Sequence, residues 1–218
     1  MSKIEFDRIK AAIFDFDGTL MDSMPDWCRK MLYQLDAAGI LYPDDIIRRI
    51  TPMGDIKAAA YFQELGLKKS LEDILEGMRS YALDAYSNRI IPKVGVRSYL
   101  QHLRRAGVPM CVLTASPREM ITPCLSRNQM TDYFAFTRSC DEMGLSKAQT
   151  QIYHETAKLL GVCASECVFF DDNIVALTTA KAAGMTTVAV FDETSRPDWE
   201  NIVSLADYAI LSFEELLG

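Results

Sequence analysis

The chain has 218 residues, of which 49% are hydrophobic and 24% are charged, and its formal net charge is −7. This composition is ordinary for a globular enzyme, and the acidic balance argues against a nucleic-acid or anionic-membrane partner, for which a basic surface is expected. No apolar run approaches the ~20 residues that a membrane span needs. The first ten residues lack the apolar segment of a signal peptide, so we expect a cytoplasmic protein. The six cysteines include no Cys-x-x-Cys pair, and we expect their thiols to be reduced.

The first predicted strand covers residues 10–16 and ends in two acidic residues. Asp15 and Asp17 stand two apart, so both side chains leave the same face of an extended strand. Gly18 then lets the backbone turn sharply. An Asp-Gly turn is common in loops, but it does not explain an aspartate inside the apolar run. Two carboxylates this close repel each other unless a cation or a proton intervenes, so the pattern favours a functional site.

From residue 22 to about residue 90 the hydrophobic spacing is helical and indicates no strand. The expected helices cover residues 22–38, 43–50, 52–65 and 70–86. The last of these begins with a Ser-x-x-Asp capping box formed by Ser70 and Asp73. We therefore expect an all-helical domain over residues 22–90, inserted into a core domain formed by residues 1–21 and 91–218.

After residue 90, short apolar strands alternate with helices. The expected strands cover residues 108–114, 133–138, 167–170, 186–190 and 208–211. The expected helices cover residues 94–106, 117–128, 148–160 and 174–183, with a short one from Phe213. This alternation indicates βαβ units, so the predicted fold class is α/β, with a doubly wound, Rossmann-like parallel sheet that is covered on both faces.

Such sheets bind ligands at the carboxyl ends of their strands, where this chain carries further polar residues. Thr114, Ala115 and Ser116 follow the second strand and precede a helix, which suits either a phosphate site or an ordinary helix cap. Asp171 and Asp172 follow the fourth strand. One of them could cap the next helix, but adjacent aspartates exceed what capping requires. Carboxylates that converge on one edge of the sheet predict a Mg²⁺ site.

Lys147 lies in a loop directly before the helix expected over residues 148–160. A solvated loop lysine is the commoner meaning of such a residue. Near a cluster of carboxylates that serves a phosphate dianion, however, a lysine has a clear task. It could neutralise charge on the phosphate and order Asp15.

Together these residues resemble the motifs of the haloacid dehalogenase-like hydrolase superfamily, in its phosphoglycolate phosphatase and β-phosphoglucomutase-like branch with a helical (C1) cap. The sequence Asp15-Phe16-Asp17-Gly18-Thr19 is similar to the first motif of that family, Thr114 to the second, Lys147 to the third and Asp171-Asp172 to the fourth. Residues 22–90 stand where the family inserts its cap. The resemblance covers almost the whole chain.

The resemblance implies a phosphatase, that is a phosphoric monoester hydrolase, which depends on Mg²⁺ and acts on a small phosphorylated metabolite. Asp15 would be the nucleophile that forms an aspartyl-phosphate. Asp17 would protonate the leaving alkoxide and then activate the hydrolytic water. The helical cap would close over the edge of the sheet, exclude water and recognise the leaving group.

The same resemblance implies which residues bind the metal and the substrate. The metal ligands would be Asp15, the Asp17 backbone carbonyl, Asp172 and Asp171, the last acting directly or through water. The phosphate would be bound by Thr114, the Ala115 amide and Lys147. In the cap, Arg49, together with Arg48 and Lys57, flanks a turn at residues 51–54 near the family's specificity loop. These side chains could contact an anionic leaving group, although solvated charges on helix faces explain them equally well.

Two alternatives on the same scaffold stay open: a phosphosugar mutase of the β-phosphoglucomutase type, and a non-catalytic binding protein that kept the fold. The mutases carry a histidine about where Trp27 stands, and residues 22–90 contain none, which favours simple hydrolysis. Dehalogenases of the superfamily lack the second aspartate of the first motif, so Asp17 argues against that chemistry. The intact set of charged motif residues argues against a binding protein. Phosphoglycolate, a sugar phosphate and a nucleoside monophosphate all fit these motifs as substrates.

Overall fold

The computed structural model describes residues 8–217, which form two compact units. The core unit contains the residues up to Asp22 and those from Ile90 onward, and the helical unit contains Ser23–Arg89. Each unit has its own hydrophobic cluster. None of the helices within residues 8–217 has the length and apolar character needed to cross a membrane.

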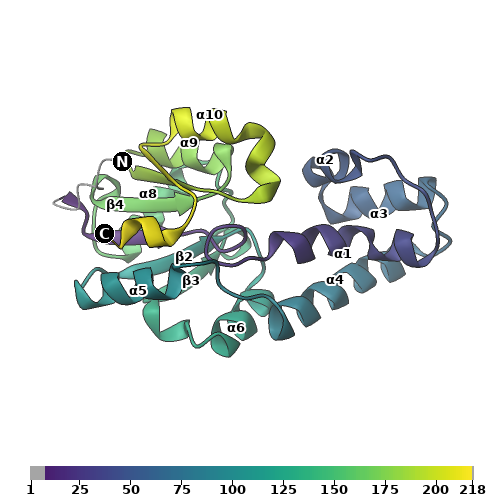
Figure 1. Ribbon diagram of the computed structural model, residues 1–218, viewed down its shortest axis with the longest axis horizontal. Helices are drawn as coiled ribbons and strands as arrows, with labels where there is room; N and C mark the ends of the chain where they lie inside the picture. Colours follow the sequence, from purple (N-terminus) through teal and green to yellow (C-terminus); the bar gives the residue numbers. More distant parts are fainter. Residues whose placement is uncertain (1–7, 218) are drawn as a thin grey trace. The chain divides into compact units, whose positions relative to one another are not determined.

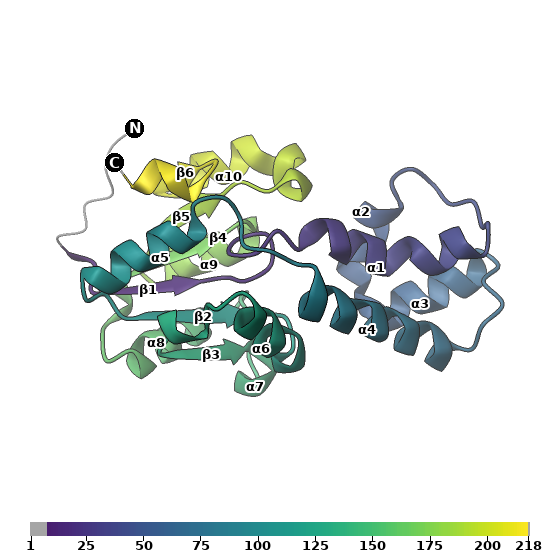
Figure 2. The ribbon, with the colours of Figure 1, turned by 60° about the horizontal axis from the view of Figure 1, so that its bottom comes forward.

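The described part of the core unit is built around six parallel strands in the order β3-β2-β1-β4-β5-β6. The strands are β1 (Ala11–Phe14), β2 (Met110–Thr114), β3 (Phe136–Ser139), β4 (Cys167–Asp171), β5 (Thr186–Val190) and β6 (Tyr208–Ile210). Figure 2 shows β1, β2 and β3 lying side by side. The reversal of strand order at β1 and β4 is that of a doubly wound sheet, which confirms the predicted α/β, Rossmann-like fold class.

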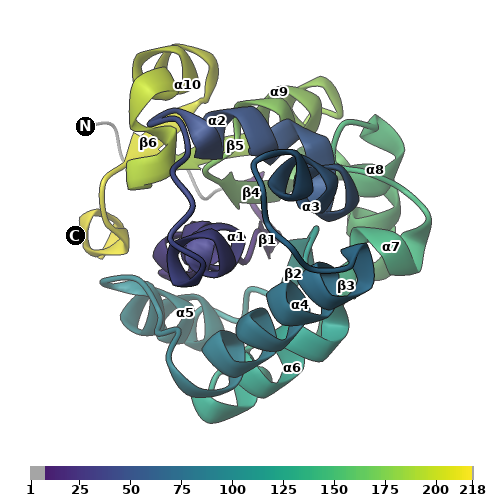
Figure 3. The same ribbon diagram turned by 90° about the vertical axis from the view of Figure 1, so that its right-hand side faces the viewer.

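Helices cover both faces of this sheet, because strands buried on both sides need apolar partners above and below. The core helices are α5 (Val96–Arg105), α6 (Arg118–Arg127), α7 (Cys140–Met143), α8 (Thr150–Leu159), α9 (Ile174–Ala182) and α10 (Trp199–Leu205). Figure 3 shows α5 and α6 on one side of the strands and α8 and α9 on the other. Ile13 packs in one cluster with residues of α8 and α9. Phe14, which points to the opposite face, stacks on Phe170 at a centroid distance of 4.7 Å and meets Tyr99 of α5 edge-on.

The helical unit packs around its own apolar cluster. Its helices are α1 (Met24–Ala37), α2 (Ile46–Ile50), α3 (Gly54–Glu64) and α4 (Leu71–Asn88), with a 3-10 turn, η2 (Thr51–Met53), before α3. Figure 1 shows α1 and α4 side by side. Gly77 permits this approach, because a Cβ there would lie 2.6 Å from the Tyr33 hydroxyl. Ser70 is the N-cap of α4 as predicted, since the Asp73 amide donates to its hydroxyl at 3.0 Å. The Asp73 carboxylate accepts from the same hydroxyl at 2.6 Å, which differs from the second bond of the predicted capping box.

Most predicted elements are present with shifted ends. The unpredicted elements include α7, α10 and the 3-10 turn η5 (Glu193–Asp198). The strand expected from residue 133 begins only at Phe136, because Tyr133 closes a 3-10 turn, η3 (Thr131–Tyr133). The final segment, from Phe213, is a 3-10 turn (η6, Phe213–Leu216) rather than an α-helix. A further 3-10 turn, η4 (Ala164–Glu166), precedes β4.

The chain leaves and re-enters the core unit through two segments that are paired with each other. Met21 forms an antiparallel bridge with Pro92. The Asp22 amide donates to the Ile91 carbonyl at 2.9 Å, and the Lys93 amide donates to the Leu20 carbonyl at 3.0 Å. The two ends between which the helical unit is inserted are therefore fixed side by side within the core unit.

Candidate active site

The candidate site lies at the carboxyl ends of β1 and β4, which are neighbours in the sheet. Ile13 of β1 pairs with Phe169 of β4, and both side chains point toward α8 and α9. Asp15 and Asp171 lie two residues further along each strand, so they leave the sheet toward the same face. The Asp15 amide donates to the Phe170 carbonyl at 2.9 Å, which holds the two ends in register.

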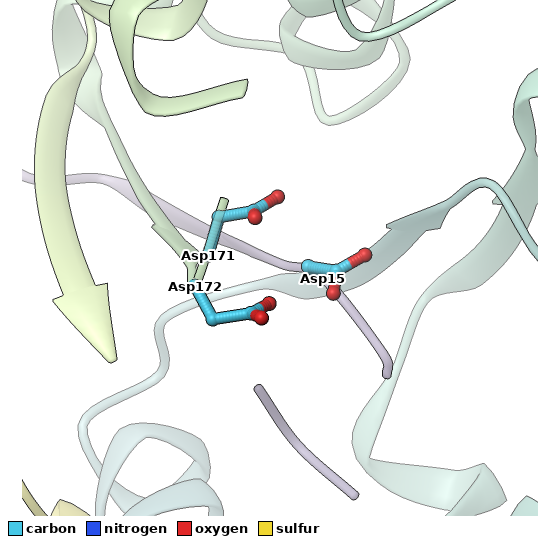
Figure 4. A group of neighbouring side chains, drawn as sticks. All are labelled: Asp15, Asp171 and Asp172. Carbon is cyan, nitrogen blue, oxygen red and sulfur yellow. The ribbon is translucent and has the colours of Figure 1, made fainter. Parts of the chain in front are cut away.

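Three carboxylates converge at this point. Figure 4 shows Asp15 beside Asp171 and Asp172, and an oxygen from each carboxylate lies within 4.8 Å of the others. Asp15 is 6% exposed and Asp171 is 1% exposed. Carboxylates that are this close and this poorly hydrated need protons or a cation to compensate their charge.

Lys147 provides part of that compensation. Its ammonium donates to Asp15 Oδ1 and to Asp171 Oδ2, the second at 2.7 Å. The loop that carries Lys147 is fixed by Tyr153 of α8, whose hydroxyl lies 2.9 Å from the carbonyl oxygens of both Lys147 and Ala176. Because α8 covers the face toward which Asp15 and Asp171 point, a lysine just before this helix reaches both carboxylates.

The charges of the site are not balanced by the lysine alone. Burial raises the pKa of Asp15 to about 7; Lys147 opposes this shift, while Asp171 and Asp17 add to it. Burial, followed by the Asp171 and Asp15 charges, raises the pKa of Asp172 well above its usual value. Burial alone would lower the pKa of Lys147, but Asp15 and Asp171 outweigh it, so the net shift is upward and the ammonium stays charged. The all-oxygen donor set therefore fits a hard divalent cation such as Mg²⁺.

The turn after β1 brings Gly18 against Asp172. Gly18 has a φ of +76°, and a Cβ there would lie 2.7 Å from Asp172 Oδ2. The Thr19 hydroxyl donates to Asp172 Oδ1 at 3.2 Å. The turn is closed by the Gly18 amide, which donates to the Met21 carbonyl at 3.0 Å. Only a residue without a side chain fits this position, since the backbone itself packs against the carboxylate.

Asp17 directs its carboxylate toward the end of β2. The Ser116 hydroxyl donates to Asp17 Oδ2 at 2.5 Å, and the Ser116 amide donates to Thr114 Oγ1 at 3.0 Å. Pro117, not a hydroxyl residue, occupies the N-cap position of α6. Thr114 and Ser116 both lie at the strand end beside Ala115, and their binding of a phosphate stays a prediction.

The alternative in which one aspartate of the fourth strand end caps the next helix is wrong. Asn173 caps α9, because its side-chain oxygen accepts from the Val175 amide at 2.9 Å and the Ala176 amide at 3.4 Å. Asp171 Oδ1 instead accepts from the Asn173 amide at 2.7 Å. With the cap supplied by Asn173, both Asp171 and Asp172 are available to the acidic cluster.

Two contacts beside the site were not predicted from the sequence, that of Ser116 with Asp17 and that of Lys93 with Gly18. Ser116 follows Thr114 by two residues at a strand end, so its proximity to an acidic partner could have been proposed from that spacing. Lys93 contacts the carbonyl of Gly18, from which it is 75 residues distant, and no local pattern indicates such a contact. Arg49 lies in the helical unit and pairs with Asp45 at 2.8 Å. Its role toward a leaving group stays a prediction.

The chain is similar to known proteins over most of its length. A family model described as haloacid dehalogenase-like hydrolase matches residues 9–184. The chain is 29% identical to hexitol phosphatase B of Escherichia coli strain K12 over 222 residues, which cover 97% of this chain and 98% of that protein. It is 31% identical to phosphoglycolate phosphatase of Pseudomonas savastanoi pv. phaseolicola over 189 residues, which cover 83% and 69%. The crystal structure of CbbY from Rhodobacter sphaeroides in complex with phosphate has the same fold, with a TM-score of 0.77 and 21% identity over 95% of this chain and 96% of that one.

Proposed function

Because this chain belongs to the haloacid dehalogenase-like hydrolase family, we propose that it is a Mg²⁺-dependent phosphatase that hydrolyses a small phosphorylated metabolite through an aspartyl-phosphate on Asp15. The observation that carries the proposal is the Lys147 ammonium, which contacts both Asp15 and Asp171 beside Asp172. Buried acids with a lysine at the carboxyl ends of parallel strands suit a phosphate dianion when a divalent cation is also bound.

Asp15 would act as the nucleophile. The carboxylate oxygen that does not bind Lys147 would attack phosphorus, while the bond from phosphorus to the leaving oxygen breaks. The product of this step is an acyl phosphate on Asp15 and a free alcohol. Water would then attack phosphorus, which releases inorganic phosphate and restores the Asp15 carboxylate.

Asp17 would transfer a proton in both steps. Its carboxyl group would donate a proton to the leaving alkoxide, and the resulting carboxylate would accept a proton from the attacking water. The Ser116 hydroxyl, at 2.5 Å from Asp17 Oδ2, would keep this carboxyl group oriented away from the acidic cluster. Asp15 contacts Lys147 whereas Asp17 contacts Ser116, which supports separate roles for two residues that are only two positions apart.

Asp15, Asp171 and Asp172 would hold Mg²⁺, with the Asp17 carbonyl as a further oxygen donor. When bound, the ion would offset the carboxylate charge that repels an incoming phosphate and would stabilise charge on the transferred group. The phosphate itself would be bound by the groups predicted for it, namely Thr114, the Ala115 amide and Lys147.

We propose phosphorylated sugars, sugar alcohols and small hydroxy acids as the substrate class. This rests on the names of the relatives, hexitol phosphatase and phosphoglycolate phosphatase. The core unit would catalyse the same reaction on all of them, since the leaving group departs as an alcohol in each case. Selection among them would then depend on residues of the helical unit, such as Arg49.

Release of inorganic phosphate from a panel of phosphoesters tests the proposal. The panel contains a hexitol phosphate, a hexose phosphate, 2-phosphoglycolate and p-nitrophenyl phosphate. We expect release that requires Mg²⁺, stops with EDTA and falls by roughly a thousandfold or more in Asp15→Asn. Asp132→Asn, which alters an exposed aspartate of the same unit, is the matched control and should keep wild-type activity.

Two outcomes would contradict the proposal. Full phosphate release by Asp15→Asn would exclude Asp15 as the nucleophile. Formation of an isomeric phosphosugar without net phosphate release, stimulated by a bisphosphate, would instead identify a mutase.

A further inference from the structure

Lys93 is a largely buried cation that lies outside the residues assigned above to catalysis, phosphate binding and the metal. Its ammonium donates to the Gly18 carbonyl at 2.6 Å, the Phe191 carbonyl at 2.7 Å and Asp192 Oδ2 at 2.9 Å. An ammonium has three N–H groups, so these three acceptors use its full donor capacity. The side chain is 17% exposed, which means that most of its hydration has been replaced by these contacts.

The acceptors come from two different strand ends. Gly18 lies in the turn after β1, between Asp17 and Thr19, whereas Phe191 and Asp192 follow β5. Asp192 is itself fixed, because its Oδ1 accepts from the amide of the residue two positions later at 2.9 Å. Lys93 therefore links the turn that carries part of the candidate site to a rigid point on the other side of β4.

The backbone of Lys93 holds the same turn a second time. Its amide donates to the Leu20 carbonyl at 3.0 Å, while its side chain binds the Gly18 carbonyl. Two carbonyls of one short turn are thus held by a single residue from a distant part of the chain. Since peptide groups are planar, fixing the Gly18 carbonyl also fixes the direction in which the Thr19 amide points.

We propose that Lys93 is a positioning residue that sets the turn at Gly18 and thereby the placement of Asp172 and Asp17. Gly18 packs directly against Asp172, and Thr19 donates to its carboxylate, so a shift of this turn moves the surroundings of a proposed metal ligand. Residues that contact a metal ligand orient it and thereby affect the affinity for the metal. The inference rests on the proposed function, because it assigns Lys93 a role in that reaction.

Lys93 also offsets the charge of Asp192. The ion pair between Lys93 and Asp192 therefore limits the negative charge that the metal site experiences from β5.

Lys93→Met tests the inference, because methionine has a similar shape but no N–H donor. We expect the Mg²⁺ concentration for half-maximal phosphate release to rise about tenfold. We also expect faster amide hydrogen exchange in the peptide that spans residues 16–21, measured without metal or substrate. If Lys93→Met does not fold, Lys93→Gln, which keeps two donors but no charge, should change both quantities in the same direction.

Asp207→Asn is the matched control for stability. It removes an ion pair with Lys181 (2.8 Å) at the opposite end of β5, where Asp207 also binds Thr187. We expect a lower melting temperature in this variant, with unchanged Mg²⁺ dependence and unchanged exchange over residues 16–21. If Lys93→Met behaves like this control, Lys93 is only structural and the inference is overturned.

The two proposals fail in different ways. A wild-type protein that releases no phosphate from any member of the panel would contradict the proposed function. Amide exchange over residues 16–21 would then still decide whether Lys93 holds the turn, because that measurement requires neither turnover nor metal.

Discussion

Gly18 and Asp172 approach each other so closely that a single methyl group does not fit between them. A Cβ on Gly18 would lie 2.7 Å from Asp172 Oδ2 and 2.9 Å from its Cγ. The two residues follow different strands and are 154 positions apart in the sequence (172 − 18). The fold therefore places bare backbone against a proposed metal ligand, and this contact can be tested by substitution.

Gly18→Ala should lower phosphatase activity at least about a hundredfold. The methyl group would displace Asp172, the proposed metal ligand, and a small misplacement of such a group can cost about a hundredfold in rate. Gly161→Ala is the control, since Gly161 has a nearly equal φ of +77° and nothing within 4 Å of a Cβ. Both variants should lose roughly 1 kcal/mol of unfolding free energy from backbone strain, measured by urea denaturation. Equal activities of the two variants would contradict a specific role for the contact.

Removing the Lys147 ammonium should destabilise the core unit in a pH-dependent way. In Lys147→Met, Asp15 and Asp171 lose their cation, and breaking a buried pair typically costs about 3 kcal/mol. The pKa of Asp15 is already raised to about 7 with Lys147 present, and loss of the ammonium raises it further. A carboxyl group whose pKa is higher in the folded than in the unfolded state weakens the fold as the pH rises through that interval.

Relative to wild type, Lys147→Met should therefore lose more unfolding free energy at pH 8 than at pH 5. Urea denaturation in EDTA measures it without interference from bound metal. Lys181→Met, which removes a half-exposed lysine from its pair with Asp207, should show a small loss. An equal loss for Lys147→Met at both pH values would show that the Asp15 and Asp171 charges do not cause the destabilisation.

Ser116→Ala should lower kcat about tenfold with little change in KM, because it frees Asp17, which is proposed to transfer a proton and not to bind substrate. The hydroxyl that is lost binds Asp17 Oδ2. Ser126→Ala, at an exposed position of α6, serves as the control in the same steady-state assay. A rise in KM with unchanged kcat would indicate that Ser116 contacts the substrate instead.

The parts of the site that follow from short-range patterns could be predicted. Asp15 stands two residues after the buried Ile13, so strand alternation decides the face to which it points. Asp171 has the same relation to Phe169 on the neighbouring strand. Parallel pairing then brings both acids to one edge of the sheet, and the loop before a helix on that face brings Lys147. Each step needs only local spacing and the handedness of βαβ units.

The parts that depend on long-range contacts or on capping could not be predicted. The local sequence shows Lys93 only as a polar residue between Pro92 and Val94. Its partners at Gly18 and Asp192 are 75 and 99 residues away. The segment after β5 was missed for a different reason. Asp192 caps a 3-10 turn there, and the polar residues of that turn interrupt the hydrophobic period before α10 begins.

The pairing of the two segments that lead into and out of the helical unit has a consequence for how such a protein can change. Asp22 and Ile91 are joined by a backbone hydrogen bond of 2.9 Å, so the core unit meets the insertion as two adjacent, fixed ends. The entropy of closing a chain between fixed ends grows slowly, by about 0.6 kcal/mol for each doubling of its length. An insertion can therefore lengthen, shorten or be exchanged with little effect on the stability of the core unit. A single chemistry in the core unit can in this way be retained while its substrate is replaced.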